Sequence, residues 1–191
     1  MIRSVMLVAM LMVVLSITAC GGPGTQQSNA PSPGDDGTRE TGASSDKASA
    51  ASNGDEAPDF DLTTLEGDEF NLADKRGEVV ALFFTAGWCD SCIPEAQAWS
   101  ELYPAYEDKG LDLLMVSIDP NDTPQTIEGF QRKSGIRPLP WAIDKTGEVS
   151  RSLNVAALGS TVIVDREGRI AYRDASETDS EALERELEEV L

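Results

Sequence analysis

From residue 57 to the C-terminus, apolar runs alternate with segments whose apolar residues recur every three or four positions. Two runs, 79–84 and 111–118, are almost wholly apolar, as expected of strands that are covered on both faces. Each run is followed by helical spacing, over 91–109 and over 123–134. A strand, a helix, a strand and a helix in this order predict a βαβ unit with parallel strands.

Shorter elements precede and follow this unit. Segments 57–62 and 69–72 flank a Glu-Gly-Asp turn and predict an N-terminal β-hairpin. Segments 161–164 and 170–172 flank an Arg-Glu-Gly turn and predict a second hairpin near the C-terminus. An extended segment and a helical turn are expected ahead of the second hairpin, at 139–144 and 149–153.

The last helix is predicted to begin at Thr178, because Glu181 three residues later completes a capping box. Its inward positions are apolar: Leu183, Leu187, Val190 and Leu191. A βαβ unit followed by a hairpin and a terminal helix resembles the thioredoxin arrangement. The expected fold class is therefore α/β and thioredoxin-like, with a central mixed β-sheet flanked by helices and an N-terminal β-hairpin extension.

Residues 1–19 have the pattern of an export signal. Arg3 precedes an apolar run over 5–17, which is shorter than the roughly 20 residues of a membrane span. The run ends in Ile-Thr-Ala directly before Cys20, and this resembles the lipobox of bacterial lipoproteins. The resemblance implies that Cys20 becomes the lipidated N-terminus, since stable anchoring takes more than one acyl chain. An uncleaved signal anchor is the alternative interpretation.

Residues 20–56 are expected to form a disordered tether. From residue 21 to residue 56 the chain has no Val, Ile, Leu, Met or aromatic residue, so it cannot bury enough apolar surface to offset the entropy of ordering. The remaining residues, 57–191, have the size of one ordinary domain. We therefore expect a signal peptide, a tether and a single folded domain.

The charge balance and the absence of histidine exclude several functions. The formal net charge is −19, so nucleic acid and anionic lipid surfaces are repelled rather than bound. Without histidine the chain has no Ser-His-Asp or Cys-His catalysis, no histidine-ligated metal and no Cys-x-x-Cys-His haem attachment. The candidate chemistry is left to the cysteines.

A Trp-Cys-Asp-Ser-Cys sequence at 88–92 connects the first buried strand to its helix. Cys89 would lie at the helix N-terminus, where free backbone N–H groups and the helix dipole favour a thiolate. Cys92 follows about one turn later, near enough to close a disulfide. This placement predicts Cys89 as the nucleophile that attacks a substrate disulfide and Cys92 as the residue that resolves the mixed disulfide.

Two simpler interpretations of the cysteine pair are weaker. A zinc site needs about four ligands, and the motif supplies two with no histidine or second cysteine pair to complete the set. A purely structural disulfide between residues three apart would remove little loop entropy from the unfolded chain. A redox role is therefore expected, with no metal and no cofactor.

Segments 57–60, 77–89 and 164–170 resemble the first strand, the central strand with its active-site approach, and the closing hairpin of the TlpA/ResA-like proteins. This group consists of membrane-anchored thioredoxin-fold proteins, and the resemblance covers the whole of 57–191. It implies thiol–disulfide exchange by Cys89 and Cys92, commonly as a reductant in cytochrome c or copper-site assembly. Trp88, directly before the first cysteine, belongs to the same motif and is expected to support the site.

Two acidic residues are expected to modify the chemistry. Glu95 matches an acid that such proteins often carry three residues after the second cysteine. Its helical position beside Cys92 predicts partial burial, so it could accept the Cys92 proton; an ordinary first-turn glutamate is the alternative. Asp90 places a carboxylate next to Cys89, which opposes thiolate formation and favours a reductant over a strong oxidant.

Gly159 departs from the pattern of the family. The cis-proline that closes the active site of this fold is expected six residues before Asp165, and Gly159 occupies that position. A cis bond without proline costs about 2.5–4 kcal/mol, so a trans peptide is expected here. We therefore expect a looser loop here, which holds a substrate strand less firmly than a cis-proline loop does.

Three rival functions follow from the same fold. A thiol peroxidase of the alkyl hydroperoxide reductase/thiol-specific antioxidant group normally shows Pro-x-x-x-Thr-x-x-Cys, whereas Thr85 lies four residues before Cys89 with no proline ahead of it. A copper-delivery protein uses wider cysteine spacing and a distal histidine, which the chain lacks. A binding-only thioredoxin fold would not need the intact cysteine pair.

The sequence thus predicts an extracytoplasmic, membrane-anchored thiol-disulfide oxidoreductase that reduces disulfides of partner proteins. Its expected partners are a disulfide-containing protein substrate, a transmembrane thiol that donates electrons, and the membrane itself through lipidated Cys20. Nucleic acid is not expected as a partner, and we expect a monomer.

Overall fold

A computed structural model describes residues 53–191 and places a five-stranded sheet at the centre of the domain, in the order β5-β4-β3-β6-β7. The strands are β3 (Val79–Thr85), β4 (Leu111–Ser117), β5 (Trp141–Ile143), β6 (Ser160–Val164) and β7 (Ile170–Arg173). β3 is parallel to β4 and antiparallel to β6. The predicted βαβ unit and mixed sheet are confirmed.

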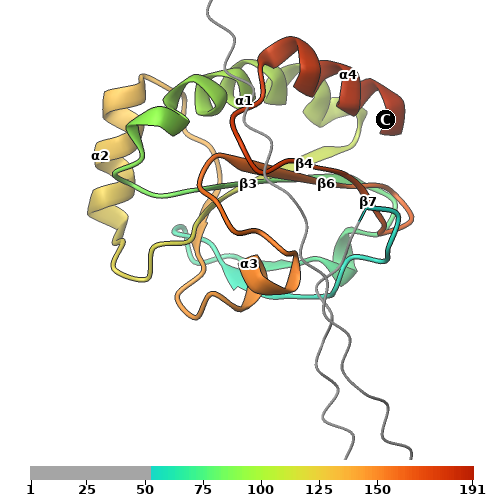
Figure 1. Ribbon diagram of the computed structural model, residues 1–191, viewed down its shortest axis with the longest axis horizontal. Coiled ribbons are helices and arrows are strands. Elements are labelled where there is room, and N and C mark those ends of the chain that lie inside the picture. Colours follow the sequence, from blue (N-terminus) through green and yellow to red (C-terminus); the bar gives the residue numbers. More distant parts are fainter. Residues whose placement is uncertain (1–52) are drawn as a thin grey trace, which may run out of the picture. The chain divides into compact units, whose positions relative to one another are not determined.

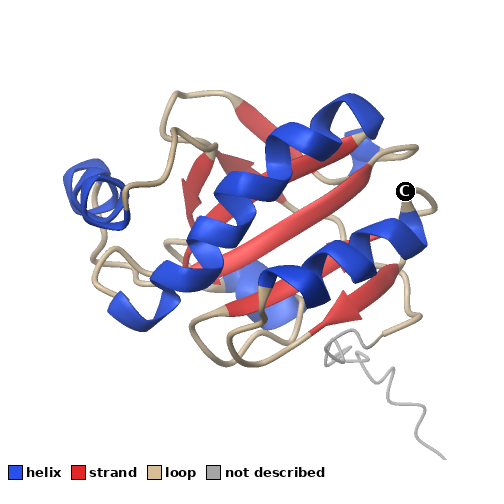
Figure 2. Cartoon of the chain, turned by 90° about the horizontal axis from the view of Figure 1, so that it is seen from above, coloured by secondary structure: helices blue, strands red, loops and turns tan. Residues whose placement is uncertain are grey.

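Helices cover both faces of this sheet (Figure 1). They are α1 (Ile93–Tyr106), α2 (Pro124–Ser134), α3 (Glu148–Ser152) and α4 (Ser180–Val190). α1 and α4 lie on one face, and in the view from above they run side by side across the strands, with the C-terminus at the end of α4 (Figure 2). The short α3 lies on the opposite face (Figure 1).

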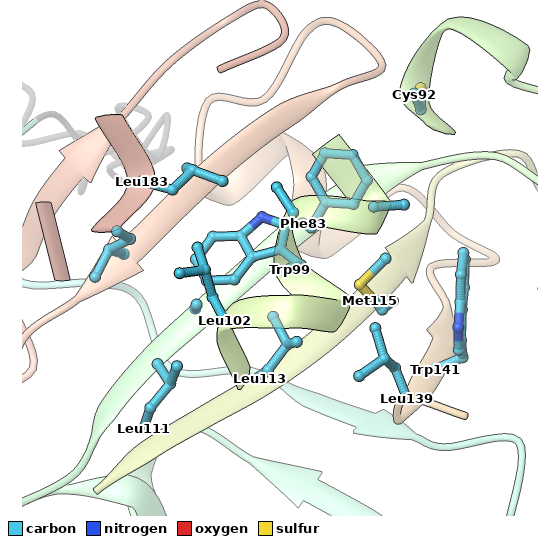
Figure 3. Packing of buried hydrophobic residues seen from close by; sticks show 14 of the residues in the cluster. Phe83, Cys92, Trp99, Leu102, Leu111, Leu113, Met115, Leu139, Trp141 and Leu183 are labelled. Carbon is cyan, nitrogen blue, oxygen red and sulfur yellow. The ribbon is translucent and has the colours of Figure 1, made fainter. Parts of the chain in front are cut away.

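Alternate residues of the central strands supply two separate hydrophobic clusters. Phe83 of β3 and Met115 of β4 face α1, where Trp99 is fully buried between the helix and the sheet (Figure 3). On the other face, Leu82 and Phe84 pack toward α3 and the N-terminal hairpin. Because both faces are covered, β3 is buried along its whole length, as its unbroken apolar sequence predicted.

The predicted N-terminal hairpin is present as β1 (Asp61–Thr63) paired antiparallel with β2 (Glu69–Asn71). The chain just before it is also ordered: the Gly54 backbone N–H donates to the Ile170 carbonyl, and the Ile170 N–H donates to the Asp55 carbonyl. The folded part therefore begins ahead of residue 57, where the sequence analysis placed its start. Backbone pairing with β7 orders residues that have no apolar side chain to bury.

The start of α4 differs from the prediction. Asp179, not Thr178, is the N-cap, and its side chain accepts the backbone N–H of Ala182. Thr178 lies outside the helix because its backbone N–H donates to Glu95 and its hydroxyl donates to Asp174. A tertiary contact thus competes with the local capping-box signal.

The predicted signal peptide at 1–19, the lipidation site Cys20 and the tether as far as residue 52 lie outside the described residues. Within 53–191, no helix has the length and apolar character needed to cross a membrane.

Candidate active site

The two cysteines of the motif lie at the end of β3, in the turn that leads into α1. They form a disulfide, with their Cα atoms 5.4 Å apart. A single 3₁₀ turn, Asp90–Cys92, precedes the regular helix, and Pro94 lies in the first turn of α1, where a missing N–H breaks no helical hydrogen bond. Cys89 therefore lies at the N-terminal end of a helical segment, as predicted.

The surroundings of the disulfide combine a buried sulfur pair with an exposed ring. Cys89 and Cys92 are 4% and 2% exposed, whereas Trp88 is 64% exposed. The Trp88 indole N–H donates to Asp119 Oδ2 at 2.6 Å, which fixes the ring at the rim of the site. The Ser91 hydroxyl lies 3.5 Å from Cys89 Sγ and is able to donate to it. The two sulfur atoms are thus largely covered, whereas the ring of the preceding residue is open to contact with a partner.

Glu95 is a buried carboxyl group one helical turn beyond Cys92, with 1% of its surface exposed. Its Oε1 accepts the Thr161 hydroxyl at 2.6 Å, and its Oε2 accepts the Thr178 backbone N–H at 3.0 Å. Burial raises the pKa of Glu95 to about 7, against the lowering effect of these two hydrogen bonds. Glu95 can therefore gain or lose a proton near neutral pH, which an exposed first-turn glutamate does not do.

The hydrogen bonds of Glu95 connect α1 to the neighbouring elements. Thr161 on β6 also accepts the indole N–H of Trp99, at 3.3 Å. The loop between β7 and α4 is held by Asp174, which accepts the Thr161 backbone N–H at 2.7 Å and the Thr178 hydroxyl at 2.5 Å. The carboxyl group beside the disulfide is thus part of a network that fixes β6 and the start of α4.

Asp90 is paired with a cation that the sequence analysis did not identify. Lys133 Nζ on α2 lies 2.5 Å from both carboxylate oxygens of Asp90. Both side chains are largely exposed, so the pair contributes little stability, but the lysine offsets the negative charge next to Cys89. The opposition of Asp90 to a Cys89 thiolate is therefore weaker than the sequence alone implied.

Gly159 lies directly against the buried cysteine. A Cβ at this position would be 3.9 Å from Cys92 Sγ and 3.8 Å from the backbone nitrogen of Glu177. Its peptide bond is trans, as expected, and its φ is +76°, a conformation that L side chains rarely adopt. The Gly159 N–H donates to the Phe84 carbonyl at 2.8 Å, a bond that a proline could not make.

The structure brings the predicted residues Trp88, Cys89, Asp90, Cys92, Glu95 and Gly159 to one end of the central strands. It adds three partners that the sequence did not indicate: Lys133, Thr161 and Thr178 lie 43, 66 and 83 residues from the side chains they contact. Ser91 could have been identified, since it lies inside the motif. Among residues 53–191, no group of His, Cys, Asp and Glu side chains is arranged to hold a metal ion.

Comparison with known proteins agrees with this geometry. The model of the AhpC/TSA family matches residues 53–173. Thiol-disulfide oxidoreductase ResA of Bacillus thuringiensis subsp. konkukian is 33% identical over 137 residues, which cover 72% of this chain and 78% of the relative. ResA of Geobacillus kaustophilus is 34% identical, with 72% of this chain and 77% of the relative covered.

A crystal structure described as a thiol:disulfide interchange protein DsbE, from Chlorobium tepidum, aligns with a TM-score of 0.66 and 27% identity, covering 74% of this chain and 99% of the other. The thioredoxin domain of a Bacteroides vulgatus thiol-disulfide oxidoreductase has the same fold, with a TM-score of 0.60 at 22% identity over 71% of this chain and 98% of that domain. The fold, the closed cysteine pair and the sequence relatives agree: the chain belongs to the AhpC/TSA family of thioredoxin-fold proteins and is a ResA-like thiol-disulfide oxidoreductase.

Proposed function

We propose that the protein reduces disulfide bonds of partner proteins outside the cytoplasm, with Cys89 as the nucleophile and Cys92 as the resolving thiol. The observation that carries this proposal is the buried carboxyl group of Glu95 beside the Cys89–Cys92 disulfide, with its pKa raised to about 7 by burial. A group that changes protonation near neutral pH suits a thiol pair that must lose and regain protons in each cycle.

The first step starts from the reduced pair. The Cys89 thiolate, at the N-terminal end of the helical segment, attacks one sulfur of the substrate disulfide. A bond forms between Cys89 and that sulfur, the substrate S–S bond breaks, and the other substrate sulfur leaves as a thiolate that takes up a proton from water. The Ser91 hydroxyl, 3.5 Å from Cys89 Sγ, is placed to donate to the attacking thiolate.

The second step resolves the mixed disulfide. Cys92 loses its proton to the Glu95 carboxylate and attacks Cys89 Sγ, which releases the second substrate thiolate and closes the Cys89–Cys92 disulfide. Two electrons have then passed from the cysteine pair to the substrate. Positions 92 and 95 are three residues apart on one helical turn, so their side chains share a face. Reduction by an external thiol restores the starting state.

We propose further that the domain acts at the outer surface of a membrane, where a transmembrane thiol carrier supplies the electrons. The basis is the N-terminal sequence: an export signal at 1–19, Cys20 in a lipobox-like position, and a polar tether before the fold. Membrane fractionation of cells that express the full chain tests this location. We expect the wild-type protein with the membranes, and Cys20→Ser either released or retained only in the larger, unprocessed form; retention of the variant at the size of the processed wild type would contradict lipidation.

Turnover assays separate the proposed function from the peroxidase alternative, which the AhpC/TSA family match makes the relevant rival. We expect the reduced full chain to reduce a protein disulfide such as that of insulin, with catalytic turnover when a dithiol is supplied. Hydrogen peroxide under the same conditions should oxidise the pair no faster than an ordinary thiol. Rapid peroxide turnover without protein-disulfide reduction would reverse the assignment.

A further inference from the structure

Asp122 is a buried carboxylate, 3% exposed, that lies between β4 and α2 and contacts the active-site turn. Its Oδ2 accepts the backbone N–H of Gly87 at 2.6 Å and the hydroxyl of Ser117 at 2.6 Å. Its Oδ1 accepts the hydroxyl of Thr126 at 3.0 Å. One side chain therefore joins the end of β4, the first turn of α2 and the residue two positions before Cys89.

The turn and α2 approach each other as closely as glycine permits. A Cβ on Gly87 would lie 3.1 Å from Asp122 Oδ1 and 3.1 Å from both the carbonyl carbon and the Cβ of Thr126. These distances are tighter than side chains normally tolerate, and two of the three atoms belong to backbone or to a β-branched side chain with little freedom to move. The glycine is thus required by the contact that Asp122 makes.

The position of Gly87 determines the position of Cys89, because both residues belong to one short hydrogen-bonded turn. The Cys89 N–H donates to the Ala86 carbonyl at 3.0 Å, so residues 86–89 form one hydrogen-bonded unit with Gly87 inside it. A charged acceptor makes shorter and stronger hydrogen bonds than a neutral one. Removing that acceptor would free the Gly87 end of the turn from α2, and the turn would then be held by its connections to β3 and to the helix and by the Trp88–Asp119 hydrogen bond.

We propose that Asp122 is a positioning residue for thiol–disulfide exchange: it holds the active-site turn against α2 and so fixes the place of Cys89 Sγ at the helix N-terminus. The inference rests on the thiol-disulfide oxidoreductase activity of the chain and not on the identity of its substrate. Asp122 acts through the Gly87 backbone and takes no part in bond making or proton transfer.

Two substitutions separate positioning from charge. Asp122→Asn removes the charge but preserves the contacts. The amide oxygen accepts from Gly87 and Ser117, and the amide NH₂ donates to the Thr126 hydroxyl. That hydroxyl then donates to the Thr123 carbonyl, which is already 2.8 Å away. Asp122→Ala removes all three bonds. Asp144→Ala is the matched control, since Asp144 is an equally buried carboxylate, 2% exposed, that accepts the Ser150 N–H on α3.

The readout is the rate at which dithiothreitol reduces the Cys89–Cys92 disulfide in the full chain, followed from pH 6 to 9. A small dithiol needs no protein docking, so the rate reports on the disulfide itself. We expect Asp122→Ala to react about 10- to 100-fold more slowly, as for a misplaced reacting group, with the midpoint of its pH profile unchanged. Asp122→Asn and Asp144→Ala should stay within about threefold of the wild type.

The outcomes are distinct. Wild-type rates in Asp122→Ala, a loss in Asp122→Asn as large as in Asp122→Ala, or an equal loss in Asp144→Ala would each overturn the inference. If Asp122→Ala does not fold, Gly87→Ala carries the test, because its Cβ forces the turn away from Asp122 and Thr126, and the same slowing is expected. A wild-type chain that exchanges normally with dithiothreitol but reduces no protein disulfide would refute the proposed function and leave this inference standing.

Discussion

Cys92→Ser is expected to accumulate mixed disulfides with its protein substrates, all of them linked through Cys89. The variant keeps the nucleophile at the N-terminal end of the helical segment but lacks the thiol that completes the second step, so the reaction stops half-way. Steady-state reduction of protein disulfides should fall by at least about 10³-fold, as for the loss of a reacting group. Non-reducing electrophoresis and peptide mapping identify the linked residue; the experiment is done with Cys20 replaced by serine so that only the pair contributes.

Cys89→Ser is the matched control. It retains the resolving thiol, which is 2% exposed in the closed pair, and it should form no mixed disulfides above background. Trapping through Cys92 in this variant, at a yield similar to that of Cys92→Ser, would mean that the roles of the two cysteines are reversed.

Glu95→Gln should change how stability depends on pH. Burial raises the folded-state pKa of Glu95 to about 7 from its ordinary value of 4.5, so between these pH values the folded chain holds a proton that the unfolded chain has lost. The free energy of unfolding therefore falls as pH rises through this window, and the loss is complete once pH exceeds the folded pKa. At about 1.4 kcal/mol per pH unit, the total is about 3 kcal/mol.

Glutamine does not titrate. Between pH 4.5 and pH 7.5 the free energy of unfolding of the variant should therefore fall by about 3 kcal/mol less than that of the wild type. Asp174 and Glu177, which act on Glu95 by charge and help to raise its pKa, are present in both proteins and cancel in the comparison. Urea unfolding of the oxidised chains at a series of pH values measures the difference. Parallel pH profiles for the two proteins would show that folding does not raise the pKa of Glu95.

Most of the fold was predictable because its signals are local. The unbroken apolar runs of β3 and β4 require burial on both faces, and the spacing of Ile127 and Phe130 predicts the inward face of α2. The helical spacing over 91–109 predicted α1, which begins two residues later, at Ile93, and ends at Tyr106, followed by a 3₁₀ turn over Glu107–Lys109. The cap of α4 was wrong because Thr178 is used by Glu95, a residue 83 positions away.

The chemistry of the site was predictable to a smaller extent. The cysteine pair and Glu95 follow from their spacing, and Gly159 follows from its distance to Asp165 in the sequence. The residues that offset the charge of Asp90 and hold the active-site turn could not be predicted in this way. Lys133 contacts Asp90 from a different helix, and Asp122 contacts Gly87 from a loop 35 residues away. Such contacts depend on how α2 packs beside the active-site turn, which no local pattern encodes.

The reduction potential of the Cys89–Cys92 pair tests the central claim, that the protein is a reductant, most directly. Glu95 places negative charge near the thiols once it is ionised, at a pH above its raised pKa of about 7, and Asp90 does so to the extent that Lys133 leaves its charge uncompensated. Negative charge disfavours the thiolate, and a less stabilised thiolate makes the dithiol easier to oxidise. Equilibration of the full chain, with Cys20 replaced by serine, against dithiothreitol buffers should give a value nearer the roughly −270 mV of thioredoxin than the roughly −120 mV of a strong oxidant. A value above about −180 mV, the region of disulfide isomerases, would contradict the assignment as a reductant.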